Sequence, residues 1–189
     1  MRTLLWILFA ILAIYMGSEG VVVDKLTSGR YAIIQAEFAD STAGKAMFKN
    51  LNQVPYGRGT LLGLVRSNTH NDFLFILDYM LLILLCSYMQ MLNEKSLALN
   101  SLLRLNLLLA VLIAALDVTE NFKILYNIRH FADRGFYSCS CIVSTFKWVL
   151  SGWAVLIWLI SLIKSLVTRG EKDPSPHRAA QSSNFRMNI

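Results

Sequence analysis

Four long blocks of apolar residues, without helical or strand periodicity, constrain this chain more than any other feature of its sequence. A helix that is apolar on all sides must be buried in protein or in lipid. A chain of 189 residues is too short to bury several such blocks in protein, so lipid remains as their solvent. The composition agrees, because 55% of the residues are hydrophobic and only 16% are charged. The sequence therefore predicts an integral membrane protein.

The predicted fold is all-α, an up-down bundle of four transmembrane helices with an amphipathic interfacial helix in the first loop. The first block, residues 4–16, is short for a span and is followed by Gly17 and Ser18, as in a signal peptide. Val21, Val22 and Val23 extend it, and we favour a retained first helix over residues 1–23. Cleavage of a signal peptide is the alternative.

The remaining spans are expected within residues 72–169, as a core of three transmembrane helices. They cover residues 73–92, a stretch from 97 or 102 to 116, and residues 142–167 with three tryptophans. A polar loop over residues 123–141 is expected to join the last two and to contain His130. The polar segment 170–189 has the composition of a disordered tail.

Residues 24–71 form a long polar segment with one helical pattern. Asp40 offers a helix N-cap, and Ala43, Ala46, Met47 and Leu51 recur on one face of the helix that follows. We expect an amphipathic helix that lies on the membrane or caps the bundle. A small independent domain is disfavoured because few large apolar residues are available for a core.

The net charge of +6 is spread over loops and tail, without the basic and aromatic platform of a nucleic-acid-binding protein. The lipid bilayer is the expected partner, and the basic residues act as topology signals. Basic residues in short flanks favour an orientation with both termini in the cytoplasm. Those on the proposed cytoplasmic side are Arg2, Lys95, Arg104, Lys164, Arg169 and Lys172, against Lys123, Arg129 and Arg134 on the other.

Ionisable residues within the spans are the best candidates for a site, because their burial in lipid is costly. An up-down bundle brings Asp78, Asp117, Glu120 and Lys147 to one level near its outer end. Asn121 shares the helix face of Asp117. A buried ion-pair network that fixes helix register is the favoured interpretation, and a proton, metal or other ligand site is the alternative.

Glu37 lies between apolar neighbours in the first loop, so either it joins the polar cluster or it stays solvated on an interfacial helix. We favour the solvated position. Three carboxylates beside one lysine, Asp78, Asp117 and Glu120 beside Lys147, leave surplus negative charge that needs a proton, an arginine or a cation.

Motifs for catalysis or cofactor binding are missing from the sequence. It has no phosphate-binding glycine loop, nucleophile elbow or HExxH motif, and no histidine lies within a predicted span. Cys139 and Cys141 are too close for an ordinary structural disulfide, and Cys86 lies in an apolar run. We therefore expect no metal and no cofactor, and assign no catalytic residue.

Four segments together resemble a family of uncharacterised bacterial four-span integral membrane proteins. They are the Ala-Glu-Phe-Ala stretch at 36–39, Asp-Phe-Leu-Phe-Ile-Leu at 72–77, Asp-Val-Thr-Glu-Asn at 117–121, and Lys147. The first departs from the family pattern, Phe-Glu-Leu-Ala, because Glu37 here precedes Phe38. The resemblance implies the four-span topology and a location in the bacterial inner membrane. It singles out these residues, but it supplies no activity.

Three functional hypotheses follow. The favoured one is an accessory or structural subunit of a larger membrane complex, bound to other membrane protein subunits. The second is a small binding or transport protein that uses the carboxylate–lysine cluster for a proton, a cation or a lipid headgroup. A membrane enzyme acting on a lipid or quinone is the third, without a specific feature in its favour.

Overall fold

The computed structural model describes residues 2–133 and 137–170. The predicted disordered tail, apart from Gly170, and the loop residues Arg134 and Gly135 lie outside this part. The elements in chain order are α1 (Arg2–Leu26), α2 (Gln35–Phe38), α3 (Ser41–Gln53), β1 (Pro55–Tyr56), β2 (Gly59–Thr60), α4 (Leu61–Asn93), α5 (Leu97–His130) and α6 (Cys141–Gly170). Within the described part, α1, α4, α5 and α6 are long and apolar enough to cross a membrane.

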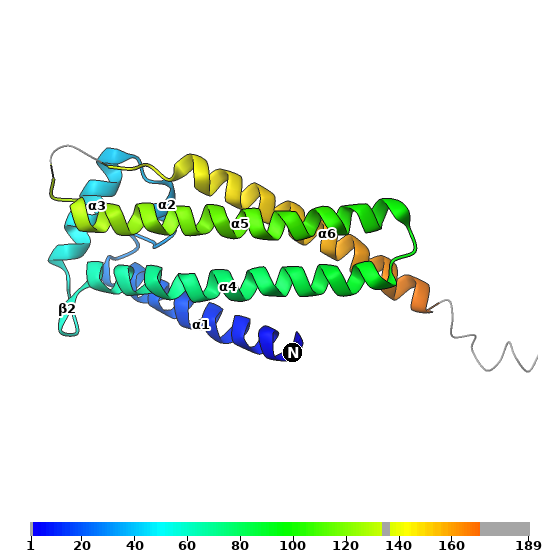
Figure 1. The fold of residues 1–189 in the computed structure, drawn as a ribbon. Coiled ribbons are helices and arrows are strands. Elements are labelled where there is room, and N and C mark those ends of the chain that lie inside the picture. Colours follow the sequence, from blue (N-terminus) through cyan, green and yellow to red (C-terminus); the bar gives the residue numbers. More distant parts are fainter. Residues whose placement is uncertain (1, 134–136, 171–189) are drawn as a thin grey trace, which may run out of the picture.

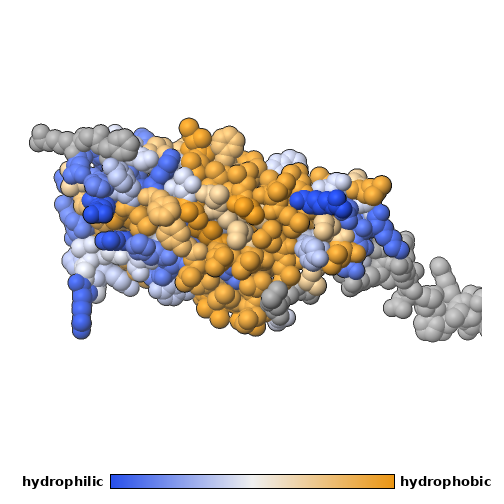
Figure 2. Space-filling view, viewed as in Figure 1, coloured by the Kyte–Doolittle hydropathy of each residue, from blue (hydrophilic) through white to orange (hydrophobic). Residues whose placement is uncertain are grey.

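The four long helices alternate in direction, which confirms the predicted all-α up-down bundle (Figure 1). The antiparallel pair α4 and α5 forms the centre, with α1 packed on α4 and α6 packed on α5. Helix α6 crosses the central pair at an angle (Figure 1). On the face seen in Figure 2, apolar residues cover the middle of the molecule and hydrophilic residues gather toward both ends, as expected for a chain that spans a bilayer.

Both central helices are longer than the predicted spans. Helix α4 begins at Leu61 rather than at residue 73, and α5 continues to His130, beyond the predicted end of its span at residue 116. The added turns are amphipathic, since Leu61 and Val65 are buried while Arg66 is exposed. Hydropathy alone misses such turns because their outer faces meet water. His70, which lies outside the predicted spans, is therefore helical, and so is His130, which was expected in a loop.

Residues 27–60, which we call the cap, fold over one end of the bundle (Figure 1). The Asp40 side chain caps α3 as predicted, accepting hydrogen bonds from the backbone N–H groups of Thr42 and Ala43. Met47 and Leu51 of the predicted face are buried, but Ala43 and Ala46 are exposed, and Gly44 and Phe48 are buried in their place. The buried residues of α3 are Gly44, Met47, Phe48 and Leu51.

These side chains join a core shared by the cap and the central helices. Val23 of α1, Ala36 of α2, Val65 of α4 and Ile124 of α5 contribute to the same buried cluster. The amphipathic helix therefore caps the bundle, one of the two predicted arrangements. Its apolar face is covered by protein, which is why a segment with few large apolar residues can fold there.

Residues 137–140, which we call the strap, lead from α5 into α6 across the cap. Asn127 of α5 holds the strap by two reciprocal bonds: its side-chain oxygen accepts from the Ser138 N–H (2.9 Å) and its nitrogen donates to the Ser138 carbonyl (2.9 Å). Tyr137 packs across Gly44, where an added Cβ would lie 1.9 Å from the tyrosine hydroxyl oxygen. Burial raises the pKa of Tyr137 to about 12.

Candidate functional site: a buried lysine among carboxylates

Lys147, in the second turn of α6, is surrounded by three carboxylates. Its Nζ lies 2.9 Å from Glu120 Oε1, 3.0 Å from Asp117 Oδ1 and 3.3 Å from Glu37 Oε2. The Lys147 side chain is only 8% exposed and that of Glu120 only 1%. We call Glu37, Asp117, Glu120 and Lys147 the lysine cluster. It is a buried charge network, in which every added or lost proton has a large energetic effect.

Helical spacing explains how two of these carboxylates meet the lysine. Asp117 and Glu120 are three residues apart on α5, so both face α6. Lys147 lies in an apolar part of α6, and its buried side chain points toward Asp117 and Glu120. The pairing is the one that the sequence predicts for Asp117, Glu120 and Lys147.

Glu37 reaches the cluster from the cap, and several contacts fix it there. The Trp148 Nε1–H donates to Glu37 Oε2 (3.1 Å). The Glu37 backbone carbonyl accepts hydrogen bonds from the hydroxyls of Ser140 (2.8 Å) and Ser144 (3.2 Å). The solvated position predicted for Glu37 is therefore wrong, because its carboxylate lies in the cluster. The serines and the indole that hold it come from the strap and α6, more than 100 positions away.

Polar residues of α4 lie next to the cluster, and one of them contacts it directly. The Tyr79 hydroxyl donates to Asp117 Oδ2 (2.9 Å), so Asp117 is held from two sides. Asn121 does not contact Lys147 through a hydrogen bond; its Nδ2 donates to Asp72 Oδ2 at 2.7 Å. The network thus extends from α6 through α5 to α4, and it connects all three core helices with the cap.

Asp78 does not join this network, contrary to the sequence prediction. It is 2% exposed, and neither carboxylate oxygen has a hydrogen-bond partner within the described residues. The reason is rotation about the helix axis, because consecutive residues on an α-helix point about 100° apart. Tyr79, seven residues after Asp72, faces α5 in its place.

Several members of the network were missed in the sequence. Asp72 and Tyr79 are seven residues apart on α4, a spacing that places both on one helix face. That signal requires α4 to begin before residue 72, whereas hydropathy placed the span from 73 onward. A further buried contact, from Asn68 Nδ2 to Glu19 Oε2 (2.7 Å), ties α4 to α1. No sequence pattern singled out Glu19, which lies beyond the first apolar block.

The charges in the lysine cluster do not balance. With all groups ionised, three carboxylates face one ammonium, which leaves two uncompensated negative charges. An unpaired buried charge destabilises a protein by several kcal/mol, about as much as removal of one partner from a buried ion pair. The cluster therefore has the composition of a site that takes up a proton or another cation. Within the described residues, no group of three metal-ligating side chains has a geometry suited to a metal ion.

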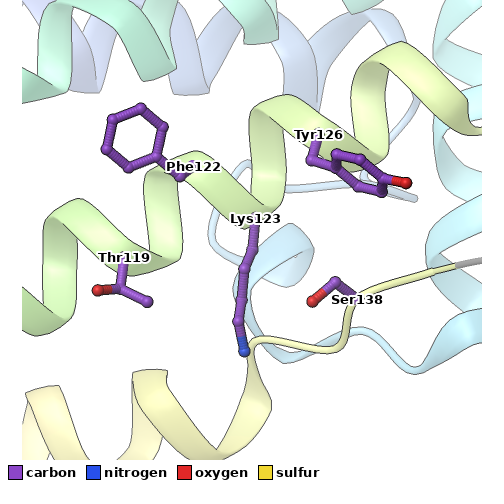
Figure 3. A pocket seen from close by; sticks show the side chains of 5 residues that line it. All are labelled: Thr119, Phe122, Lys123, Tyr126 and Ser138. Atoms are coloured by element: carbon purple, nitrogen blue, oxygen red, sulfur yellow. The ribbon is translucent and has the colours of Figure 1, made fainter.

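A shallow groove lies on the outer side of the same stretch of α5. Its volume is about 330 Å³, and it is lined by Thr119, Phe122, Lys123, Tyr126 and Ser138. Figure 3 shows Lys123 extending from α5 toward the strap that carries Ser138. The Lys123 Nζ donates to the Cys139 carbonyl of the strap at 3.1 Å. The groove therefore lies beside the part of α5 that carries Glu120, although none of the residues that line it belongs to the lysine cluster.

Comparison of the chain with models of known families, with curated proteins and with solved structures finds no match. The four long apolar helices of the described residues are those of a multi-pass membrane protein.

Proposed function

We propose that this chain is an accessory or structural subunit of a larger membrane complex, in which it holds the cap in a fixed orientation on the membrane. The observation that carries the proposal is the position of Lys147, which joins Glu37 of the cap to Asp117 and Glu120 of α5. The ionisable groups of the lysine cluster thereby connect α5 and α6 with the cap. Such a rigid arrangement suits a protein that presents a surface to partners.

The outer face of α6 supports this proposal. It carries exposed aromatic side chains at intervals along the helix, among them Phe146 (60% exposed) and Trp153 (57% exposed). Aromatic residues are enriched at protein–protein interfaces, where they contribute a large contact area. We propose that this face contacts another membrane subunit.

Membership in the bacterial four-span family is also proposed, with both termini in the cytoplasm. The segments on which the resemblance rests converge in space. They supply the four members of the lysine cluster, Glu37, Asp117, Glu120 and Lys147, and also Asp72 and Asn121, which are hydrogen-bonded to each other. Segments that supply contacting polar residues support a shared architecture more than scattered similarity does.

The test is extraction of the full chain from native membranes in mild detergent, followed by native electrophoresis and mass spectrometry of the co-migrating proteins. We expect one or a few proteins in constant ratio to this chain. A variant with Glu37→Gln, Ser140→Ala and Ser144→Ala should weaken the attachment of the cap and reduce the co-migration. Its matched control is Asn52→Ala on the exposed side of α3.

The control should co-migrate like the wild-type chain. Migration of the wild-type chain alone, or as an oligomer of itself, would contradict a subunit role.

A second function, binding or transport of a proton or another cation, is favoured by one observation. The three carboxylates around Lys147 exceed its charge, so the cluster has capacity for a positive species. Reconstitution into liposomes with an internal pH dye tests it, with Asp117→Asn as the variant and Asp133→Asn, an exposed carboxyl in the segment after α5, as the control. Flux that Asp117→Asn abolishes and Asp133→Asn retains would favour this function. Absence of flux in the wild-type chain would count against it.

A further inference from the structure

We propose that the groove lined by Thr119, Phe122, Lys123, Tyr126 and Ser138 binds an anionic phospholipid, with the phosphate at Lys123. This site is separate from the lysine cluster and does not depend on the subunit role. Its occupant is a lipid because two aromatic side chains that line the groove, Phe122 and Tyr126, are exposed on α5. The argument rests on shape, charge and position.

The groove is formed before any ligand binds. One wall is α5 and the other is the strap, and the reciprocal bonds between Asn127 and Ser138 hold these walls together. Asn127 is 2% exposed, so these bonds are protected from water. Lys123 adds a further contact, to the Cys139 carbonyl. A ligand therefore meets walls that are already ordered, which lowers the entropic cost of binding.

The charge of the groove favours an anion. Within residues 2–133 and 137–170, Lys123 has no carboxylate at ion-pair distance, and the Cys139 carbonyl takes up only one of its three N–H donors. Ser138 lies on the same lining, whereas the Thr119 hydroxyl donates to the Ala115 carbonyl at 2.8 Å. An ammonium beside the Ser138 side chain is suited to a phosphate.

The position of the groove favours a lipid over a soluble anion. Phe122 is 62% exposed and Tyr126 is 44% exposed, so the lining between the polar groups is apolar and aromatic. Aromatic side chains of this kind gather at the boundary between the hydrocarbon core and the headgroups. Thr119 and Phe122 lie on the side of Lys123 toward the middle of α5, which gives an acyl chain a path from the phosphate into the bilayer.

Lipid binding to the purified full chain, measured by native mass spectrometry, tests the proposal. The probes are phosphatidylglycerol, phosphatidylcholine with the same acyl chains, and glycerol 3-phosphate. We expect phosphatidylglycerol to remain bound in preference to phosphatidylcholine, and glycerol 3-phosphate not to bind. Lys123→Gln should weaken phosphatidylglycerol binding about fivefold, the factor expected for one cation near a headgroup. Lys123→Arg should retain it.

The matched control is Lys45→Gln, which removes the same charge from the cap, where Lys45 donates to the Asp133 carbonyl. It should leave lipid binding unchanged. Equal losses in Lys45→Gln and Lys123→Gln would overturn the proposal, because they would indicate attraction by overall charge. Equal binding of the two lipids, or binding of glycerol 3-phosphate, would overturn it as well.

Discussion

The ammonium of Lys147 and the carboxylate of Glu37 lie 3.3 Å apart, although 110 positions separate the two residues in the sequence. One belongs to the last transmembrane helix and the other to the cap between α1 and α4. The contact fastens the cap to α6, next to the hydrogen bonds that Ser140 and Ser144 donate to the Glu37 carbonyl. Loss of the Lys147 charge should therefore destabilise both the cap and the end of the bundle that the cap covers.

Lys147→Met should destabilise the protein by about 3–5 kcal/mol, because it leaves buried carboxylates without their cation. Adding Glu120→Gln should restore part of the loss, since Glu120 is the most deeply buried of the three acids. Adding Asp117→Asn should restore a smaller part. Thermal melting in detergent gives the comparison. Equal melting temperatures for the single and double variants would contradict the pairing.

Gly44→Ala should lower the melting temperature, because its Cβ would lie 1.9 Å from the hydroxyl oxygen of Tyr137. Gly63→Ala is the matched control, since Gly63 is also in a helix but has no atom within 4 Å of the added Cβ. Alanine is about 1 kcal/mol better than glycine in a helix interior, so the control should gain stability. The two substitutions therefore differ in sign. A gain in both would show that Tyr137 does not pack over α3.

Cys139 provides a test of orientation, because it is exposed on the cap side of the bundle whereas Cys86 is buried. In a chain with Cys141→Ser, a membrane-impermeant maleimide added to intact cells should label Cys139. Lys95→Cys, at the α4–α5 connection, should be labelled only after cell lysis when Cys139→Ser is also present. The reverse pattern would place the cap in the cytoplasm.

Acid should weaken the contact between Glu94 and Lys164 at the opposite end of the bundle. Burial opposes ionisation of Glu94, but donors from Lys164 and the Ser96 backbone outweigh it and lower the pKa of this carboxyl. A carboxyl with a lowered folded pKa contributes stability above its unfolded pKa, about 4.3, and loses it as the pH falls through the folded value. Melting temperature against pH should therefore fall less steeply between about pH 5 and pH 3 in Glu94→Gln.

The control is Asp24→Asn, an exposed carboxyl near the cap. It should retain the wild-type pH dependence. An unchanged slope in Glu94→Gln would mean that this contact does not contribute to stability.

The membrane spans could be predicted from sequence because lipid demands long apolar runs, but their ends could not. The turns from Leu61 to Asp72 and from Phe122 to His130 are helical without being apolar on all sides. Their buried faces exist only because the cap covers them. The N-cap at Asp40 was predictable since it is local, whereas the face of α3 that packs inward depends on partners elsewhere in the chain.

The candidate site was predictable to the extent that helical spacing determined it. Asp117 and Glu120 share a face, and Lys147 is the ionisable residue near the same end of the last span, so their meeting follows from an up-down bundle. Glu37 depended on the path of a loop, and Asp78 on a rotation of about 100° that counting along the helix axis does not reveal. Tertiary packing, rather than sequence spacing, decided both.

Helices α4 and α5 contain 33 and 34 residues, so each is about 50 Å long at 1.5 Å per residue. That exceeds a hydrocarbon core of about 30 Å, and the excess forms the foundation of the cap. Two unbroken helices therefore join the membrane-spanning part of the molecule directly to the cap. When α4 and α5 tilt to match a thinner or thicker bilayer, the cap turns by the same angle, so the direction in which it faces depends on membrane thickness.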